Sequence, residues 1–184
     1  MTRVLVPLAQ GCEELEAVTI IDLLRRAGME VVTAGLDAAP VQASRGTVLV
    51  PDTTLDAVAE SDFDMVVLPG GLPGATNLDA DPRVHRLLAR QAAQDRWCAA
   101  ICAAPLVLAS AGLLEGREAT SFPGALKADE HPGIRLSEAP VVTDGKVVTS
   151  RGPGTAMDFA LHLIELLAGR AERDAVESKL MRPR

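Results

Sequence analysis

Aromatic residues, cysteines and long apolar runs are all scarce in this sequence, and each scarcity excludes a class of protein. Aromatic residues make up 2% of the 184 residues, with one Trp and no Tyr, which argues against an aromatic cage for a substrate. No stretch approaches the roughly 18 consecutive apolar residues of a membrane-spanning helix. Met1-Thr2-Arg3 leads directly into an apolar segment, so we expect no signal peptide.

The cysteine content and the charge point to one environment. The three cysteines, Cys12, Cys98 and Cys102, are odd in number and not spaced as zinc ligands. We therefore expect free thiols in a reducing cytoplasm. The 18 basic and 25 acidic residues give a net charge of −7, so we expect no groove for nucleic acid and no binding to an anionic membrane.

The pattern along the chain predicts an α/β fold with a doubly wound, mostly parallel sheet between helices. Short β-rich runs alternate with longer helical patterns, which is typical of that class. No composition shift marks a linker, so we predict a single domain over residues 1–184. The predicted strands are 3–8, 29–34, 65–68 and 97–101. Residues 41–51 are predicted to form a hairpin or an excursion on the sheet edge, and 141–150 a hairpin. The predicted helices are 14–27, 85–95, 105–110, one that opens at 151–155 and ends at Gly169, and 172–180.

Gly70 and Gly71 directly follow a predicted buried strand, where doubly wound folds place their ligand crevice. Two glycines there allow the backbone to approach a ligand. The segment is neither GxGxxG nor a P-loop, so it supports no dinucleotide or phosphate site. A tight turn remains the simpler interpretation of these glycines alone.

Cys102 stands where a predicted strand turns into a predicted helix. Such a corner projects the side chain above the sheet and beside the N–H groups of a helix start. Those dipoles favour a thiolate, so we expect a lowered pKa for Cys102. The alternative is an inert core cysteine, which we expect of Cys98.

A nucleophilic cysteine needs a partner that handles protons. His85 and His162 lie within predicted helices, which leaves His131 in a loop as the candidate histidine. The acidic run Glu13-Glu14-Leu15-Glu16 follows the first strand. Two of these carboxylates are expected to complement the helix dipole, whereas Glu16 can turn inward to the sulfur. Burial there would raise its pKa.

Cys12 and residues 150–155 also allow more than one interpretation. Cys12 is expected to be accessible to solvent, with its pKa raised by the neighbouring carboxylates. Residues 150–155 are interpreted as a tight turn and helix cap beneath the Cys102 corner, in preference to an anion nest.

Taken together, these motifs resemble the DJ-1/ThiJ/PfpI superfamily, and its DJ-1 branch most of all. The resemblance covers nearly the whole chain in collinear order. The segments that carry it are Gly11-Cys12-Glu13-Glu14-Leu15-Glu16-Ala17-Val18, Leu23-Leu24-Arg25-Arg26-Ala27-Gly28, Val67-Leu68-Pro69-Gly70-Gly71, Ala99-Ala100-Ile101-Cys102-Ala103-Ala104-Pro105 and Thr149-Ser150-Arg151-Gly152-Pro153-Gly154-Thr155.

The resemblance implies a flavodoxin-like sandwich, a homodimer and a role for each matched residue. Cys102 matches an oxidation-sensitive nucleophile, and Glu16 matches a protonated glutamate that hydrogen-bonds its sulfur. Gly71 and Ala103 match positions whose N–H groups line an oxyanion site, which Gly70 adjoins. Arg45 matches an arginine that approaches the site from the dimer interface, with Glu14 nearby.

The activities implied by the resemblance are glutathione-independent glyoxalase, deglycation of glyoxal adducts on proteins and nucleotides, oxidative-stress sensing and chaperoning. None requires a metal or cofactor. Family peptidases carry histidine directly after the nucleophile, so Ala103 argues against a protease. Aligned on Ser137-Glu138, the position of a histidine in some relatives is Gly133, two residues after His131. Glu16 is therefore expected to handle protons alone. The alternative to a glyoxalase and deglycase is a sensor that acts through oxidation of Cys102.

Overall fold

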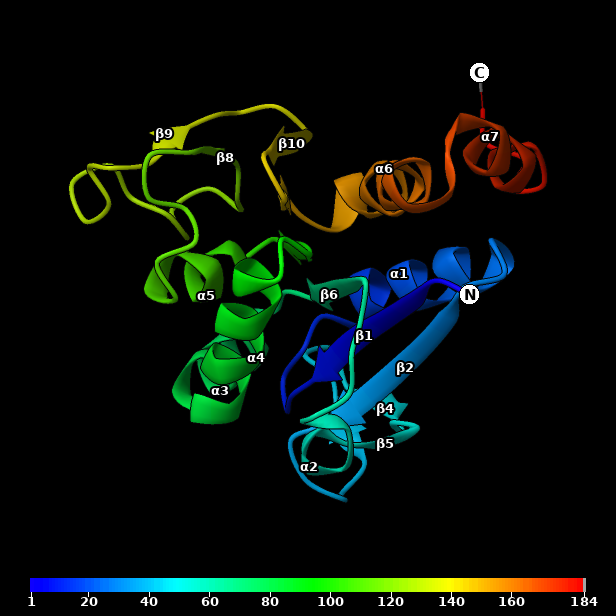
Figure 1. Cartoon of the computed structure of the whole chain (residues 1–184), viewed down its shortest axis with the longest axis horizontal. Helices are drawn as coiled ribbons and strands as arrows, with labels where there is room; N and C mark the ends of the chain where they lie inside the picture. The colour runs from blue at the N-terminus through cyan, green and yellow to red at the C-terminus, as the bar shows by residue number, and fades with distance from the viewer. Residues whose placement is uncertain (184) are drawn as a thin grey trace.

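Seven strands form the central sheet of the computed structural model, which describes residues 1–183 (Figure 1). Their order is β10-β11-β7-β6-β1-β2-β5, and every neighbouring pair is parallel except β10 and β11. The strands of this sheet are β1 (Arg3–Leu8), β2 (Glu30–Gly35), β5 (Thr53–Thr54), β6 (Met65–Leu68), β7 (Trp97–Ile101), β10 (Val141–Asp144) and β11 (Val147–Ser150). Two small sheets lie outside it, formed by β3 (Val41–Gln42) with β4 (Val48–Leu49) and β8 (Glu118–Ala119) with β9 (Arg135–Leu136).

Helices cover both faces of the central sheet. One layer contains α1 (Glu14–Arg26), α6 (Ala156–Ala168), which follows the short 3-10 turn η1 (Pro153–Thr155), and α7 (Arg170–Ser178). The opposite layer contains α2 (Leu55–Val58), α3 (Leu72–Ala80), α4 (Pro82–Ala93) and α5 (Pro105–Ser110). The prediction of a doubly wound, mostly parallel sheet between helices is confirmed.

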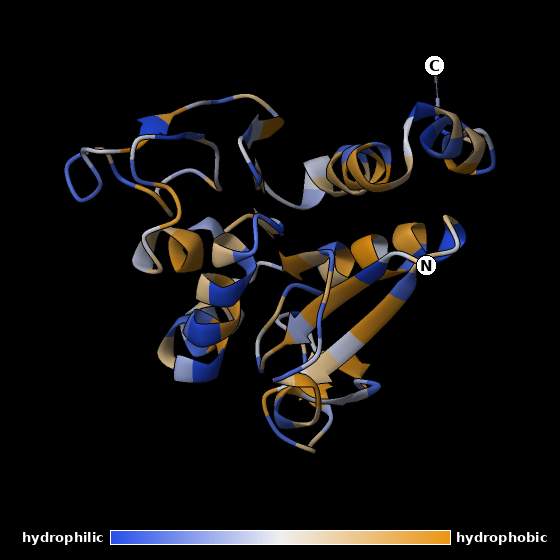
Figure 2. Cartoon of the chain, in the orientation of Figure 1, coloured by the Kyte–Doolittle hydropathy of each residue, from blue (hydrophilic) through white to orange (hydrophobic). Residues whose placement is uncertain are grey.

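Successive side chains of each strand point to opposite faces of the sheet, and this alternation gives a separate apolar core on each face. Val4 and Val6 of β1 face the α1 and α6 layer, whereas Leu5 between them faces the α3, α4 and α5 layer. All three side chains are fully buried. Figure 2 shows the result as apolar strands with apolar stripes on the covering helices. A strand buried on both faces needs such a continuous apolar run.

Several boundaries differ from the sequence prediction. The predicted bounds of β1, β6, β7 and α5 are confirmed, whereas β2 begins one residue later and α4 three residues earlier than predicted. Helix α3 (Leu72–Ala80) was not predicted from the sequence. Proline is tolerated in a first helical turn, and Gly74 is required for packing: a Cβ there would lie 2.6 Å from the Cys12 Cα.

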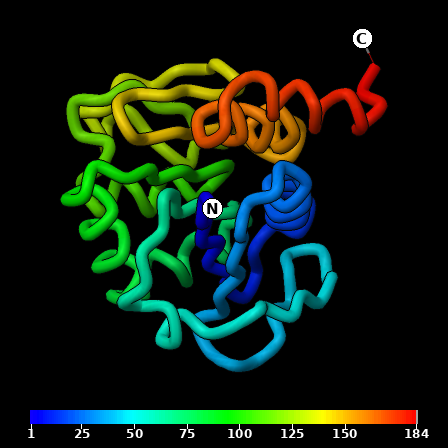
Figure 3. The backbone as a smooth tube through the Cα atoms, turned by 45° about the vertical axis from the view of Figure 1, so that its right-hand side comes forward, coloured from blue at the N-terminus to red at the C-terminus, as the bar shows by residue number. Residues whose placement is uncertain are grey.

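The topology gathers the carboxyl ends of β1, β6 and β7 at one edge. From β1 the chain proceeds to β2 on one side, and later through β6 and β7 on the other side. The crevice of such a sheet lies at this reversal. Figure 3 shows the red C-terminal helix on the outside of the fold. The segments after β1, β6 and β7 carry Glu16, Gly70 and Cys102 respectively.

Candidate active site

Cys102 occupies a strained corner between β7 and α5. Its φ of +66° lies in the left-handed region, which side chains rarely adopt. Two hydrogen bonds fix the corner: the Cys102 N–H donates to the Ser150 carbonyl at 3.0 Å, and the Phe122 N–H donates to the Cys102 carbonyl at 2.8 Å. Such strain persists only where the surroundings impose it, and it is typical of functional sites.

Residues 150–155 support this corner from below. The Ser150 hydroxyl donates to the Pro140 carbonyl at 2.7 Å and contacts the Thr155 hydroxyl at 2.7 Å. The Thr155 hydroxyl in turn accepts from the Gly152 N–H at 3.1 Å. The interpretation of this segment as a turn and helix cap is confirmed.

Glu16 turns inward from the first turns of α1, and it is fully buried. Its Oε2 accepts a hydrogen bond from the Gly70 N–H at 2.8 Å. A Cβ on Gly70 would lie 2.4 Å from the Cys102 Cβ and 2.5 Å from this Oε2. Cys102 and Glu16 therefore approach the same point over Gly70, and only glycine leaves room for both.

Burial raises the pKa of the Glu16 carboxyl from 4.5 to about 7. Hydrogen bonding with the Cys102 side chain and then with the Gly70 N–H favours the charged form, but these contacts only partly offset the loss of solvent. The raised pKa predicted from the sequence is confirmed. A carboxyl with this pKa can both give and take a proton near neutral pH.

The pKa of the Cys102 thiol contradicts the sequence prediction. We expected the helix start to lower it, but burial and the Glu16 carboxylate raise it to about 12. Cys102 is 8% exposed, so its charged form is poorly solvated. Part of the increase depends on the charge of Glu16, because a carboxyl that keeps its proton no longer repels a thiolate. The two groups therefore titrate as one coupled pair.

The backbone N–H groups of Gly71 and Ala103 approach the sulfur and favour the thiolate. Gly71 has a φ of +86°, and a Cβ there would lie 2.5 Å from the Gly11 carbonyl oxygen. Glycine is thus required both for the conformation and for the close approach. Two N–H donors beside a nucleophile form the arrangement that stabilises an oxyanion.

The sulfur opens into a cavity of about 480 Å³. Arg45 of the same chain reaches it from the β3–β4 hairpin.

Glu14 does not line the cavity. Its carboxylate instead accepts from the Arg45 N–H at 3.0 Å and from the Ser44 hydroxyl at 3.2 Å, which holds the hairpin turn. Glu14 therefore positions Arg45 within this chain. The residues lining the cavity are Glu13, Ser44, Arg45, Gly71, Leu72, Pro73, Cys102, Ala103, Phe122, Pro123, Gly124, Ala125 and Pro153.

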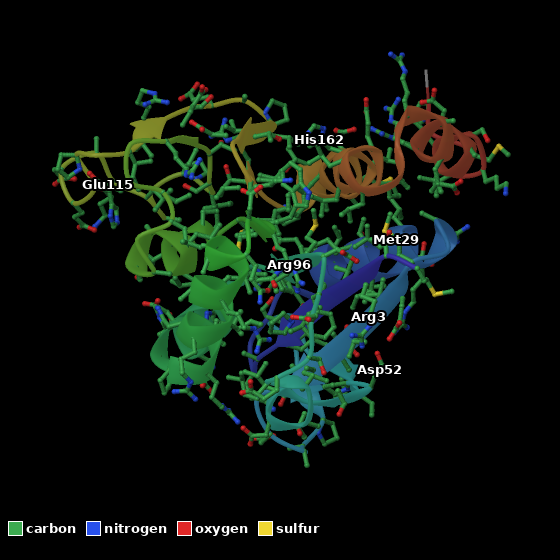
Figure 4. The ribbon with its side chains drawn as sticks, in the orientation of Figure 1. Arg3, Met29, Asp52, Arg96, Glu115 and His162 are labelled. Carbon is green, nitrogen blue, oxygen red and sulfur yellow. The ribbon has the colours of Figure 1, made fainter. Side chains whose placement is uncertain are left out.

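The structure places no histidine in this cavity. His131 lies in the loop before Gly133, with its N–H donating to the Lys127 carbonyl at 2.9 Å. His162 lies on α6 (Figure 4), where its Nε2 is 2.7 Å from the Thr143 hydroxyl. A Cβ on Gly133 would meet the carboxylate end of the exposed Glu115 side chain.

The other two cysteines are core residues. Cys98 is 2% exposed, and burial raises its pKa to about 12, as expected for an inert thiol. The expectation that Cys12 is accessible is wrong, because it is fully buried against α3. Its pKa is raised to about 11 by burial first and by Glu14 and Glu13 next.

Sequence reasoning missed two residues of the site. Glu13 caps α1 by accepting the Glu16 N–H at 2.8 Å, and it also lines the cavity. Its position before a helix was the available signal. Phe122 is half exposed at the cavity, and no local pattern marks it because it reaches the site only through the tertiary fold.

Metal ligation and membrane insertion are two further properties that side-chain grouping and helix character bear on. Among residues 1–183, no three His, Cys, Asp or Glu side chains are grouped so that they could hold a metal ion. Over the same residues, no helix has the length and apolar character needed to cross a membrane.

Comparison with known proteins gives consistent results. The model of the DJ-1/PfpI family matches residues 2–166. Parkinson disease protein 7 homolog of Danio rerio is 44% identical over 184 residues, which are 97% of this chain and 96% of the relative. Glutathione-independent glyoxalase DJR-1.2 of Caenorhabditis elegans is 36% identical over 160 residues, which are 87% of this chain and 85% of the relative. The crystal structure of Drosophila melanogaster DJ-1beta has a TM-score of 0.94 and 41% identity, covering 100% of this chain and 99% of that one.

Proposed function

Since this chain belongs to the DJ-1/PfpI family, we propose that it is a cysteine-dependent glyoxalase that converts 2-oxoaldehydes such as methylglyoxal into 2-hydroxy acids without glutathione. One observation carries the proposal: the buried Glu16 carboxyl, with a pKa near neutrality, lies beside Cys102 at the base of an open cavity. The relative from Caenorhabditis elegans that is named a glutathione-independent glyoxalase supports it.

In the first step the Cys102 sulfur forms a bond to the aldehyde carbon, and the carbonyl oxygen becomes an oxyanion. The Gly71 and Ala103 N–H groups stabilise this charge, and loss of one such donor typically costs about 2.7–4 kcal/mol. The Glu16 carboxylate takes the thiol proton as the carbon–sulfur bond forms, which a pKa of about 7 allows near neutral pH. It then gives this proton to the oxyanion, which yields a neutral hemithioacetal and leaves Glu16 as a carboxylate.

In the second step the Glu16 carboxylate takes the proton from the former aldehyde carbon. An enediolate forms, and the same proton returns to the neighbouring carbon while the hydroxyl proton on the first carbon's oxygen passes to the second oxygen. The first carbon is thereby oxidised to a thioester and the second is reduced to an alcohol, so no external oxidant or reductant takes part. Water then hydrolyses the thioester, which releases the 2-hydroxy acid and restores the thiol.

Deglycation follows from the same first step. In an early glyoxal adduct an amine or thiol of a protein or nucleotide is joined to the aldehyde-derived carbon. Attack by Cys102 on that carbon expels the amine or thiol, and the later steps are unchanged. The cavity is open to solvent beside the exposed Arg45, so we include glycated proteins and nucleotides among the proposed substrates.

The proposal is tested by lactate formation from methylglyoxal in the absence of glutathione. Cys102→Ser is expected to lower kcat/KM by about 1,000-fold or more, because no group in the cavity replaces the nucleophile. Cys98→Ala is the matched control, since Cys98 is buried away from the cavity, and it should retain activity. Undiminished lactate formation by Cys102→Ser would show that the reaction does not pass through this sulfur.

A second candidate role is a peroxide sensor. The Glu16 Oε1 is buried and has no hydrogen-bond partner among residues 1–183. A protonated carboxyl there can donate to an oxygen added to the Cys102 sulfur. Peroxide converts a thiolate to a sulfenate and releases water, and Glu16 would stabilise that product. Glu16→Gln separates the roles, since an amide still donates a hydrogen bond but moves no proton.

We also propose that the chain forms a homodimer, as the family resemblance implied. Val18 of α1 and Val48 and Val50 of the β4 segment are 47%, 61% and 79% exposed. Val18 and Val50 line one surface depression, and exposed apolar side chains gathered in this way favour a partner surface there. Sedimentation should show a dimer for the native chain and a monomer for Val50→Asp, and a native monomer would exclude this part of the proposal.

A further inference from the structure

The mouth of the active-site cavity carries two large apolar side chains that the proposed chemistry does not use. Leu72 is 65% exposed and Phe122 is 50% exposed, and both line the cavity. Solvent contact of this extent is unfavourable for apolar groups, and neighbouring exposed apolar residues at a cavity are typical of a ligand-binding surface.

Each of the two side chains is fixed relative to the reacting groups. Leu72 is the first residue of α3 and directly follows Gly71, whose N–H faces the Cys102 sulfur. The Phe122 N–H donates to the Cys102 carbonyl at 2.8 Å. The Phe122 ring lies over Gly152, where a Cβ would be 3.4 Å from its Cδ2. The ring therefore has a fixed support, and its position is tied to the nucleophile through the backbone.

The cavity separates polar groups from an apolar wall. The sulfur and the two N–H groups are at its base, whereas its wall contains Leu72, Pro73, Phe122, Pro123, Ala125 and Pro153. Of the two charged residues in the lining, Glu13 is engaged by the Glu16 N–H at 2.8 Å. A volume of about 480 Å³ is far more than methylglyoxal fills.

We propose that Leu72 and Phe122 are specificity-determining residues, and that the preferred substrates are 2-oxoaldehydes whose keto carbon carries a bulky apolar group, aryl or branched alkyl. This inference rests on the proposed glyoxalase function. The aldehyde carbon bonds to sulfur, its oxygen faces the N–H groups, and the apolar group covers the Phe122 and Leu72 side chains. The reaction balance is unchanged: phenylglyoxal and water give mandelate, as methylglyoxal and water give lactate.

The experiment compares phenylglyoxal with methylglyoxal as substrates of the full chain. Mandelate and lactate are quantified by chromatography at initial rates, and the ratio of the two kcat/KM values is calculated. The native chain should favour phenylglyoxal by at least about tenfold, since one methylene in an apolar pocket already gives 10–200-fold discrimination. Phe122→Ala and Leu72→Ala should each lower that ratio by about tenfold, mainly by raising KM for phenylglyoxal.

Two variants make the test specific. Phe122→Leu keeps an apolar side chain and should restore most of the ratio. Met157→Ala removes a side chain that is 43% exposed on α6 and lies outside the cavity lining, so it should leave the ratio unchanged.

Three results would overturn the inference. One is equal kcat/KM of the native chain for the two substrates. Another is an equal loss of kcat for both substrates in Phe122→Ala, which would mean that the ring excludes water and does not select the substrate. Arg45→Ala, rather than Phe122→Ala, could change the ratio. Each of these requires activity with methylglyoxal, whereas an absence of lactate from the native chain would refute the proposed function itself.

Discussion

Replacement of Glu16 by glutamine should make the protein more stable at alkaline pH while it abolishes proton transfer. The buried carboxyl has a pKa of about 7, whereas the same group in the unfolded chain titrates at 4.5. Below the unfolded pKa both states are protonated, so the carboxyl imposes no cost. As pH rises from 4.5 to about 7 the folded state holds a proton that the unfolded state has lost, so stability falls.

The size of this effect follows from the two pKa values. Each pKa unit corresponds to about 1.4 kcal/mol, so a shift from 4.5 to about 7 removes about 3 kcal/mol of unfolding free energy once the pH exceeds both values. Glutamine has nearly the same shape and does not ionise. Its amide can replace the neutral carboxyl, although the contact with the Gly70 N–H depends on the orientation of the amide oxygen.

Urea unfolding at about pH 4 and about pH 8 measures the effect for both chains. From about pH 4 to about pH 8 the native chain should lose about 3 kcal/mol more unfolding free energy than Glu16→Gln loses. Glu138→Gln, an exposed change outside the cavity lining, is the control and should show no such dependence. Repeating the comparison in a Cys102→Ser background removes the contribution of the thiol.

A pH-independent difference would refute this reasoning, because it would mean that the Glu16 carboxyl titrates alike in the folded and unfolded chains. The same variant should form lactate at least about 100-fold more slowly than the native chain, since general acid–base catalysis contributes on that scale. Greater stability with lost activity would show that the buried carboxyl is retained for its chemistry.

Three further results are expected. Gly70→Ala should lower both activity and stability, the latter by about 1–3 kcal/mol in urea unfolding, because the added methyl group would lie 2.4 Å from the Cys102 Cβ; a fully active variant would contradict the packing described. Limited peroxide should modify Cys102 before Cys12 or Cys98 in mass spectra of peptides, since only Cys102 lines the cavity; earlier oxidation of either core cysteine would exclude the sensor role. Glu14→Ala should raise KM more than it lowers kcat, because the Arg45 N–H loses its acceptor at 3.0 Å; an unchanged KM would show that Arg45 does not bind substrate.

The sequence was most informative where a local rule applied. Alternating strands and helical runs predicted the doubly wound sheet, and the strand-to-helix corner identified Cys102 without any coordinates. Glu16 was selected because a carboxyl after the first strand reaches the same edge of a parallel sheet. Its raised pKa also followed from burial alone, which the apolar pattern already indicated.

Other features depended on contacts that no local pattern records. Helix α3 was missed because it contains Gly74, a poor helix former that is needed there only for its close contact with Cys12, a residue far away in the sequence. Cys12 was expected to be accessible, but this same contact buries it. Glu14 is placed by its hydrogen bond with the β3–β4 hairpin. Phe122 is placed by the hydrogen bond between its N–H and the Cys102 carbonyl.

By itself, the sequence determined which residues carry reactive groups and on which elements they stand, because secondary structure follows from periodicity and backbone preference among neighbours. The tertiary structure alone decided the electrostatic state of Cys102. A helix start favours a thiolate by a local dipole, but the pKa of Cys102 rises because surrounding elements exclude water and bring Glu16 beside it. Solvent exclusion is a property of the assembled fold, so no local segment could have revealed it.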